Sequence, residues 1–412
     1  MSRDNRIDLI GVIILVGFAF SVSFHYILGA YVQLPYPYNT FLFRPDDKFM
    51  DFFNGYRIVA DGSPYLSSGG DFDRMQRAHL PFTQFIQYIF SFSTPIISFS
   101  IFLAVFVFFL VWCCYKNLRT QNGIETVRNV VVFSLLTYPF LIEIDRAHIE
   151  AITFIFFYLF VHFYQKEKFS ISSFFLACTI AMKPYSLVFV PLLAFDRKFK
   201  EIGITLAYTA ALTAVSLMVF KGGAVENLRN MLANISLNYN IYTVGNEGLY
   251  FGHSLFGLFK VFIVPDFLFD AKGYYSFITT FSRIYFYAAA AIFLLLSYYV
   301  FLEKEFWKRV TLLTFAMLIL PYNSPDMRLL HLYVPLFLFI NKDRHDPYDS
   351  LYAVLLALLF VPKDYWHYAP IPEISSSIVA TPIIIVVISL LIIVRGIKSR
   401  SLLREDAPAT RY

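Results

Sequence analysis

Three carboxylates lie within six residues in one polar segment, at Asp46, Asp47 and Asp51, soon after the first long apolar stretch. Acidic groups at the edge of a membrane could accept protons during a reaction. Asp51 is the leading candidate for a general base, because its apolar neighbours should place it against the membrane face, where desolvation raises a carboxyl pKa. The alternative is a solvated loop face, and it applies most strongly to Asp46, Asp47, Asp61, Asp71 and Asp73.

Four basic residues stand singly in short polar segments between apolar runs, at Arg146, Lys183, Arg328 and Lys363. Ionisable groups near a bilayer usually face a bundle interior or a watery cavity and pair with each other or with a ligand. Arg146, Lys183 and Arg328 could therefore hold a phosphate or pyrophosphate, which suits both guanidinium and ammonium groups. The alternative is snorkelling or local pairing: Arg146 with Glu143 or Glu150, Arg328 with Asp326, and Lys363 with Asp364.

Two histidines lie in the same polar segments. His148 and His331 could carry a proton or donate a hydrogen bond to phosphate, although a lone His near an interface is often only a polar cap. Tyr56 and Glu150 are further candidates for the site. Walker loops, zinc-ligand spacings and the nucleophile elbow are absent from the sequence, so we expect no cofactor and no nucleic-acid partner. A divalent metal among Asp46, Asp47 and Asp51 is conceivable but not favoured.

Composition places these residues in a polytopic membrane protein. Of 412 residues, 58% are hydrophobic and only 15% are charged, against about one quarter in soluble domains. The three cysteines lie in apolar stretches, so nothing indicates a disulfide framework. We predict an all-α fold with about twelve transmembrane helices, some of them short or broken, at 8–31, 95–115, 129–142, 149–165, 170–182, 185–195, 202–220, 282–302, 310–321, 329–340, 350–362 and 376–394.

The predicted spans form one transmembrane domain over 1–395, followed by a basic and then polar tail at 396–412. Two long loops, 32–94 and 221–281, lie on one face. In the first, 48–60 and 81–92 should form helices along the membrane surface. In the second, 226–240 should be a polar helix, and 250–269 is interpreted as re-entrant or interfacial.

Lysine and arginine counts set the expected orientation. The termini and the five loops predicted on their side hold 20 of these residues, whereas the four short segments on the other face hold four: Arg146, Lys183, Arg328 and Lys363. Because cytoplasmic loops are enriched in Lys and Arg, both termini should be cytoplasmic and the candidate site should face outward. The expected location is the cytoplasmic membrane.

Four short motifs, in order along the chain, resemble glycosyltransferase family 87 of the GT-C superfamily. They are Asp51-Phe52-x-x-x-Tyr56 with Gly62-x-Pro64-Tyr65; Asp145-Arg146-Ala147-His148-Ile149-Glu150, where many members have Gly and Asn in place of Ala and His; Lys183-Pro184-Tyr185; and Asn323-Ser324-Pro325 with His331. A second His and a Trp common near the Ser-Pro segment are Leu330 and Arg328 here.

The resemblance implies a GT-C-like fold and inverting transfer of mannose or another sugar from a polyprenyl-phosphate donor to a lipid-linked or envelope glycan acceptor. Asp51 would then be the base, and Arg146, Lys183, His331 and Arg328 would bind the donor phosphate. The rival interpretation is a transporter or flippase of a lipid-linked sugar, whose charges would line a passage. An O-acyl or phosphoglycerol transferase is a third possibility.

Overall fold

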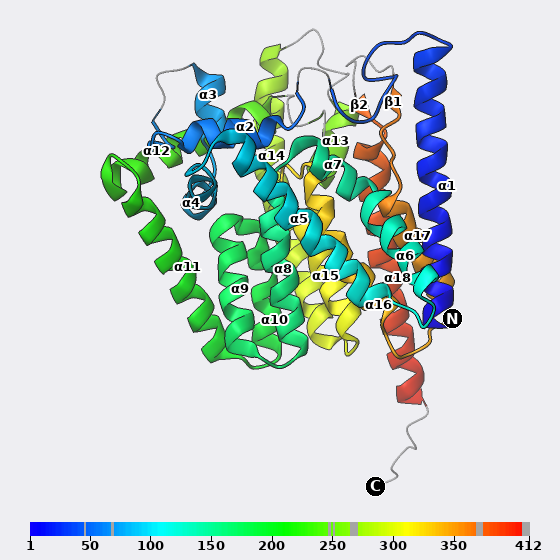
Figure 1. Cartoon of the computed structure of the whole chain (residues 1–412). Coiled ribbons are helices and arrows are strands. Elements are labelled where there is room, and N and C mark those ends of the chain that lie inside the picture. Colours follow the sequence, from blue (N-terminus) through cyan, green and yellow to red (C-terminus); the bar gives the residue numbers. More distant parts are fainter. Residues whose placement is uncertain are drawn as a thin grey trace.

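The computed structural model describes residues 1–44, 47–66, 70–245, 249, 252–263, 271–367 and 374–405, which form an almost wholly helical bundle (Figure 1). The predicted all-α class is confirmed, since the named strands have two residues each. The elements are α1 (Arg3–Ala30), α2 (Met50–Val59), α3 (Asp71–Gln76), α4 (Pro81–Phe90), α5 (Pro95–Leu118), α6 (Gly123–Leu135), α7 (Tyr138–Arg146), α8 (Glu150–Gln165), α9 (Phe169–Met182), η1 (Pro184–Phe189), α10 (Val190–Phe195), α11 (Phe199–Val219), α12 (Gly223–Asn238), η2 (Tyr239–Val244), α13 (Leu255–Ile263), α14 (Ala271–Leu302), α15 (Phe306–Ile319), η5 (Asp326–Leu332), α16 (Tyr333–Ile340), α17 (Asp349–Phe360), β1 (Trp366–His367), β2 (Ile374–Ser375) and α18 (Ser377–Glu405).

Five described helices are long and apolar enough to cross a membrane: α1, α5, α11, α14 and α18. The pair α6 and α7 makes a sixth if its two bent halves are counted as one span. The chain is therefore a polytopic membrane protein. The other described helices are too short to cross a bilayer alone, so the predicted number of twelve spans stays a prediction.

One predicted span is divided into two helices, and two other helices extend beyond their predicted spans. The span at 129–142 is not one helix, because α6 ends at Leu135 and α7 begins at Tyr138, with a bend of 53° between them. Pro139 lies in the first turn of α7, where a missing backbone N–H costs nothing, whereas the same proline would break a helix interior. Helix α14 begins at Ala271 rather than at 282, and α18 continues to Glu405, so that most of the predicted tail is helical.

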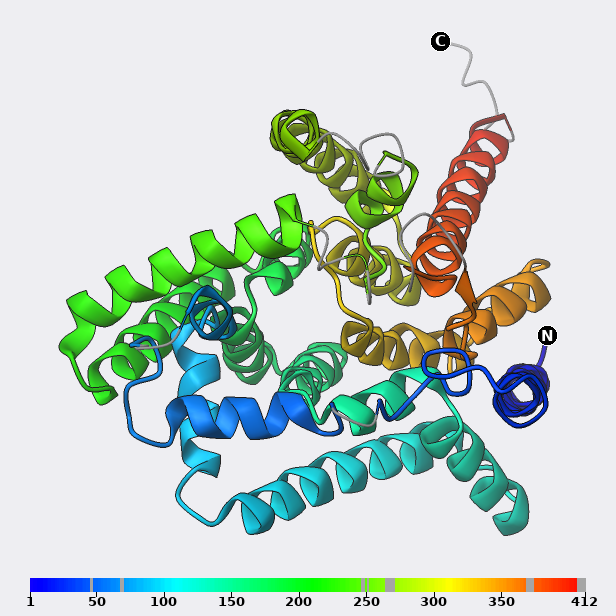
Figure 2. The ribbon, with the colours of Figure 1, turned by 90° about the horizontal axis from the view of Figure 1, so that it is seen from above.

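The helices predicted in the two long loops are present. Helix α2 lies within 48–60, α4 within 81–92, and α12 covers most of 226–240. Helix α13 has nine residues, and part of the stretch around it lies outside the described residues. In both views α2 lies across one end of the bundle, nearly in line with α7 (Figures 1 and 2).

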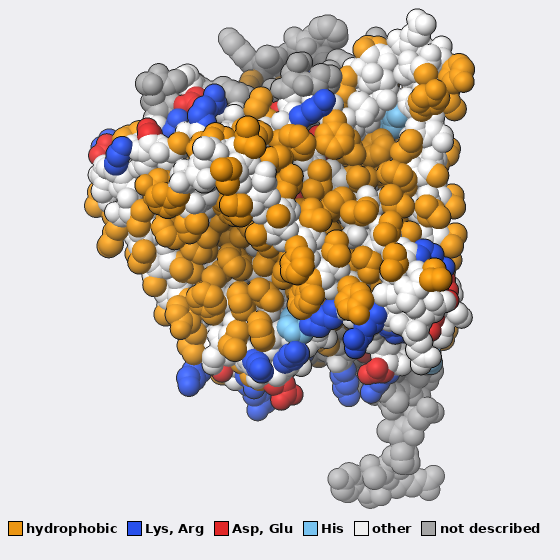
Figure 3. Space-filling view, in the orientation of Figure 1, with side chains coloured by type: hydrophobic (Ala, Val, Ile, Leu, Met, Phe, Trp, Pro, Cys, Tyr) orange, Lys and Arg blue, Asp and Glu red, His pale blue; other side chains and the backbone are white. Residues whose placement is uncertain are grey.

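Charged and apolar side chains separate along the bundle. On the face drawn in Figure 3 an apolar band covers the middle, and Lys and Arg gather most densely at the lower end. That end also holds the N-terminus and the last described turn of α18 (Figure 1). A broad apolar belt between two polar ends is the distribution expected of a protein surrounded by lipid.

Gly55 allows α2 to approach α4 closely. A Cβ at this position would overlap the Gln87 side-chain amide, which is buried. We expect Gly55→Ala to destabilise the fold by roughly 1 to 3 kcal/mol, since either α2 or Gln87 must move. Thermal unfolding in detergent measures the effect. Gly203→Ala is the matched control, because no atom lies within 4 Å of its added methyl group, and it should leave the melting temperature unchanged or raise it.

Candidate functional site

Asp51 and Arg146 meet in a forked ion pair between α2 and α7. Arg146 Nε lies 3.1 Å from Asp51 Oδ2, and Nη2 lies 2.7 Å from Oδ1. The remaining guanidinium nitrogen, Nη1, donates to Asp47. The two main predicted site residues therefore touch each other, and Arg146 pairs with neither of its expected local partners, Glu143 and Glu150.

Asp145 positions the loop that carries Asp51. Its backbone carbonyl accepts a hydrogen bond from the Phe49 N–H at 2.8 Å, and its carboxylate Oδ1 accepts one from the Phe43 N–H at 3.0 Å. Both bonds tie the segment before α2 to the end of α7. The adjacent residues Asp145 and Arg146 thus act together, one holding the loop and the other holding Asp51.

The pair with Arg146 reverses the pKa direction expected for Asp51. Burial raises the pKa of Asp51, as the sequence predicts, but the charge and hydrogen bonds of Arg146 outweigh it and the pKa lies below its ordinary value. As long as this pair persists, Asp51 is an ionised partner of arginine and a weak base. It can become a stronger base only if the guanidinium moves away.

The same pair predicts acid sensitivity. Because the pKa of Asp51 is lower in the folded chain than its ordinary 3.8, its ionised form stabilises the fold above that value, and the contribution is lost as pH falls through the folded-state pKa. Wild type should exceed Asp51→Asn in stability by about 1 to 2 kcal/mol at pH 7, and the difference should shrink as the pH falls below the ordinary Asp pKa of 3.8. Thermal melts of both proteins from pH 3 to 8 measure it; a difference that grows toward acid would contradict the assignment.

Ala147 ends α7 in the left-handed region, with φ 48° and ψ 49°. This conformation favours glycine, which is the residue that the similar family segment carries at this position. After this residue the chain turns directly into α8, which begins at Glu150. His148 Nδ1 accepts a hydrogen bond from the Glu150 N–H at 3.1 Å, so the proton of its neutral ring lies on Nε2.

Lys183 faces two histidines. Its Nζ lies 3.5 Å from His79 Nδ1, and the His79 and His148 rings are 6.3 Å apart. Burial, reinforced by the charge of Lys183, holds the pKa of His79 well below its ordinary value and lowers that of His148 to about 4. Both imidazoles are therefore neutral near pH 7, and the positive charge of this region resides on Lys183 and the arginines.

Glu150 and His331 form a buried pair behind Lys183. His331 Nε2 lies 2.7 Å from Glu150 Oε1, the Tyr185 hydroxyl donates to the same oxygen, and the His331 ring is fully buried. His331 is therefore held by Glu150 and packed against Phe157, with ring centroids 5.1 Å apart. In this arrangement it supports the site through Glu150 rather than by facing a ligand.

Arg328 reaches the cluster from η5. Its guanidinium lies over the Tyr185 ring, 4.2 Å from the centroid, and Nη1 donates to the Asn323 carbonyl at 2.8 Å. Asp326, its expected partner, instead accepts a hydrogen bond from the Tyr138 hydroxyl. The Tyr56 hydroxyl donates to the Ser93 carbonyl at 2.7 Å, and the residue lines a small cavity together with Asp51.

A second buried polar cluster anchors the Ser-Pro segment. His253 Nδ1 lies 3.1 Å from Asp326 Oδ1, and its Nε2 lies 3.1 Å from the Ser324 hydroxyl. Tyr138 bridges Asp326 and Asp364 through its hydroxyl. These contacts join the second long loop, η5 and the segment after α17. They hold the element that carries Arg328 and His331.

Lys363 donates to the Leu358 and Val361 carbonyls, so it caps the end of α17.

The space beside Asp51 is small. A cavity of about 10 Å³ is lined by Asp51, Phe52, Tyr56, Gln87, Phe90, Phe102, Ala147 and Ile149. This volume suits about one water molecule, so the cavity as it stands does not hold a sugar. Within the described ranges, no three His, Cys, Asp or Glu side chains are grouped to hold a metal. Asp46, one acid of the conceivable metal site, lies outside those ranges.

The sequence predicted most of the cluster and missed two members. Asp51, Arg146, Lys183, Arg328, His148, Glu150 and His331 come together, whereas Tyr56 shares only a small cavity with Asp51 and directs its hydroxyl to Ser93. His79 was missed because it sits in an ordinary loop before α4, and its carbonyl is held by the hydroxyl of Tyr65 at 3.1 Å. Tyr185 belongs to the Lys183-Pro184-Tyr185 motif, but the sequence does not predict that its hydroxyl donates to Glu150.

Fold and site together define an integral membrane protein with a cluster of carboxylates, cations and neutral imidazoles at one end of its helical bundle. A comparison with protein families then matches residues 80–321 to glycosyltransferase family 87, which covers more than half of the chain. The chain belongs to this family and is a glycosyltransferase. Neither a curated protein nor a solved structure matches it. The match includes Arg146, His148, Glu150 and Lys183, whereas Asp51, Arg328 and His331 lie outside it.

Proposed function

We propose that the protein is an inverting glycosyltransferase that moves a sugar from a polyprenyl-phosphate donor to a lipid-linked or envelope glycan acceptor. The observation that carries this proposal is the meeting of Asp51 and Arg146 beside Lys183 at one end of the bundle. A base, a phosphate-binding fork and a half-buried ammonium are the parts that a single displacement at a sugar phosphate needs. Membrane lipid supplies the surroundings of the long donor tail.

In this mechanism the acceptor hydroxyl gives its proton to Asp51 while its oxygen attacks the anomeric carbon. The bond from that carbon to the phosphate oxygen breaks, and the electron pair leaves with the polyprenyl phosphate. Lys183 and Arg146 stabilise the charge that develops on the phosphate. A single displacement inverts the anomeric configuration and needs no second catalytic carboxylate.

Arg146 links donor binding to the activation of Asp51. A donor phosphate competes with the Asp51 carboxylate for the same guanidinium fork, which matches either group. When the guanidinium turns to the phosphate, the cause of the lowered Asp51 pKa is removed, and burial then raises that pKa. Asp51 thus becomes a useful base only when the donor is in place.

We place the site on the outer face of the cytoplasmic membrane. The loops with most Lys and Arg lie at the opposite end of the bundle, and basic loops favour the cytoplasmic side. A lipid-linked donor fits this location, since nucleotide sugars do not cross the membrane. Accessibility of a single cysteine introduced at Ser93 to an impermeant thiol reagent in intact cells tests the orientation.

The proposal is tested with purified protein in vesicles that contain a radiolabelled polyprenyl-phosphate sugar. Donors that differ in the sugar are supplied one by one with a crude glycolipid extract as acceptor. We expect one donor to yield free polyprenyl phosphate and a labelled product of inverted configuration. Movement of the intact donor between leaflets without cleavage would instead identify a flippase. Transfer from a nucleotide sugar alone would refute the donor class.

A further inference from the structure

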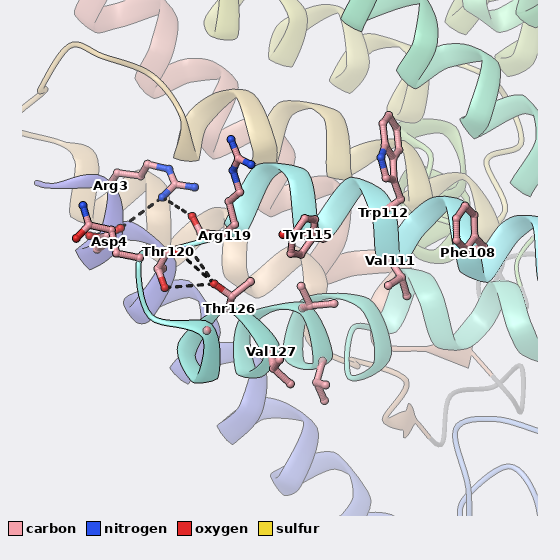
Figure 4. Close-up of a pocket in the computed structure, with 14 residues that line it drawn as sticks. Arg3, Asp4, Phe108, Val111, Trp112, Tyr115, Arg119, Thr120, Thr126 and Val127 are labelled. Atoms are coloured by element: carbon pink, nitrogen blue, oxygen red, sulfur yellow. Dashed lines mark hydrogen bonds and ion pairs between the residues drawn. The ribbon is translucent and has the colours of Figure 1, made fainter.

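A large groove lies between α5 and α6, near the N-terminus of α1 (Figure 4). Its volume is about 1170 Å³, above the 300 to 1000 Å³ range of ordinary ligand clefts. The groove is lined by Arg3, Asp4, Phe108, Val111, Trp112, Tyr115, Arg119, Thr120, Gln121, Gly123, Thr126, Val127, Val130 and Val131.

The groove is amphipathic along its length. Apolar side chains of both helices line its wall, including Phe108 and Val127, which are 76% and 64% exposed. Arg3, Arg119 and Thr120 gather at its other end, where α5 turns into α6 (Figure 4). A ligand that fits this surface has a long apolar part and a polar head.

The polar end carries an excess of positive charge. Arg3 is held in place by hydrogen bonds to the Asn117 and Arg119 carbonyls at 2.8 and 3.2 Å. The Arg119 side chain is exposed and has no hydrogen-bond or ion-pair partner among the described residues. The one carboxylate that lines the groove, Asp4, lies 3.5 Å from Arg3 and is 70% exposed.

The groove is far from the Asp51 cluster. Phe99 of α5 packs on Phe52, beside Asp51, with ring centroids 5.5 Å apart. Arg119 follows α5 twenty residues further along, which at 1.5 Å per residue is about 30 Å, the thickness of a hydrocarbon core. A lipid whose head lies at Arg119 therefore belongs to the opposite leaflet from a donor whose phosphate lies at Arg146.

From these observations we infer that the groove between α5 and α6 binds one anionic phospholipid of the leaflet opposite the catalytic cluster. Its phosphate contacts Arg119 and Arg3, and its acyl chains lie along Phe108, Val111 and Val127. Basic recesses between transmembrane helices are known to hold anionic head groups in this way. The inference does not depend on the identity of the donor or the acceptor.

Fluorescence of Trp112, which lines the groove, reports the bound lipid. Purified protein is placed in vesicles with brominated phosphatidylglycerol or brominated phosphatidylcholine, and the Trp112 signal is the difference between wild type and Trp112→Phe. We expect phosphatidylglycerol to quench this signal at about fivefold lower mole fraction than phosphatidylcholine, since each basic residue favours anionic lipid. Equal quenching by the two lipids would overturn the inference.

Substitutions of Arg119 test whether its positive charge selects the anionic lipid. Arg119→Gln should remove the preference for phosphatidylglycerol, and Arg119→Lys should keep most of it. Lys200→Gln is the matched control, because it removes an exposed cation from α11, which does not line the groove. If Arg119→Gln does not fold, Val127→Phe is used instead, because its larger side chain occupies the apolar part of the groove. Native mass spectrometry should then detect less phosphatidylglycerol retained by this variant than by wild type. Retention equal to wild type in the folded variant overturns the inference.

Discussion

Asp51→Asn is expected to lower sugar transfer by at least about 100-fold, because loss of a positioned general base removes a factor of 10² to 10⁴. The amide is nearly the same shape as the carboxylate and can still accept one hydrogen bond from Arg146. Donor binding should therefore persist while the chemical step fails. Single-turnover transfer from a radiolabelled polyprenyl-phosphate sugar, with donor affinity measured in parallel, separates these two effects.

The control for this variant is Asp61→Asn in the same loop. The Asp61 Oδ1 accepts a hydrogen bond from the Ser63 N–H at 2.9 Å, and asparagine preserves that acceptor. It should transfer sugar at the wild-type rate. If Asp51→Asn also retained the wild-type rate, Asp51 would only be the structural partner of Arg146, and another carboxylate of the cluster, such as Glu150, would have to be considered.

Side-chain chemistry and the order of motifs predicted most of the residues that lie together in the cluster. A single charged group between apolar runs is costly unless it has a partner. Arg146 and Lys183 stand in such positions, so the sequence alone predicted that each would have a partner in a polar site. The same reasoning could not say which groups pair. Arg146 finds Asp51 across 95 residues of sequence, and that contact reverses the pKa direction inferred from local surroundings alone.

Helix boundaries were predicted less well because hydropathy does not encode the bends. The predicted span at 129–142 is mostly apolar, yet it is divided just before Pro139, and the second half turns so that Arg146 faces α2. The spans predicted at 185–195 and 329–340 begin instead as η1 and η5. These irregular turns lie beside Lys183 and carry Arg328 and His331, so the errors fall where the site is built.

Lys183→Met is expected to weaken donor affinity by about 10- to 100-fold, since a hydrogen bond to a charged group contributes roughly 1.5 to 3 kcal/mol. Methionine keeps the length of the side chain and removes only the ammonium. Burial lowers the pKa of Lys183, so the folded chain holds this charge at a cost that a bound phosphate can offset. Equilibrium binding of polyprenyl phosphate, the product with the same phosphate, measures the loss.

Stability distinguishes this role from a structural one. The described hydrogen-bond contact of the Lys183 ammonium is His79 Nδ1 at 3.5 Å, so replacement by an apolar group should leave the melting temperature unchanged or raise it. Lys221→Met, an exposed lysine near the turn at Gly62, controls for a general loss of positive charge and should bind polyprenyl phosphate normally. A Lys183→Met protein that melts earlier but binds polyprenyl phosphate as wild type does would assign Lys183 to the fold. Weak binding by a protein of full stability is the combination that only a ligand-binding cation produces.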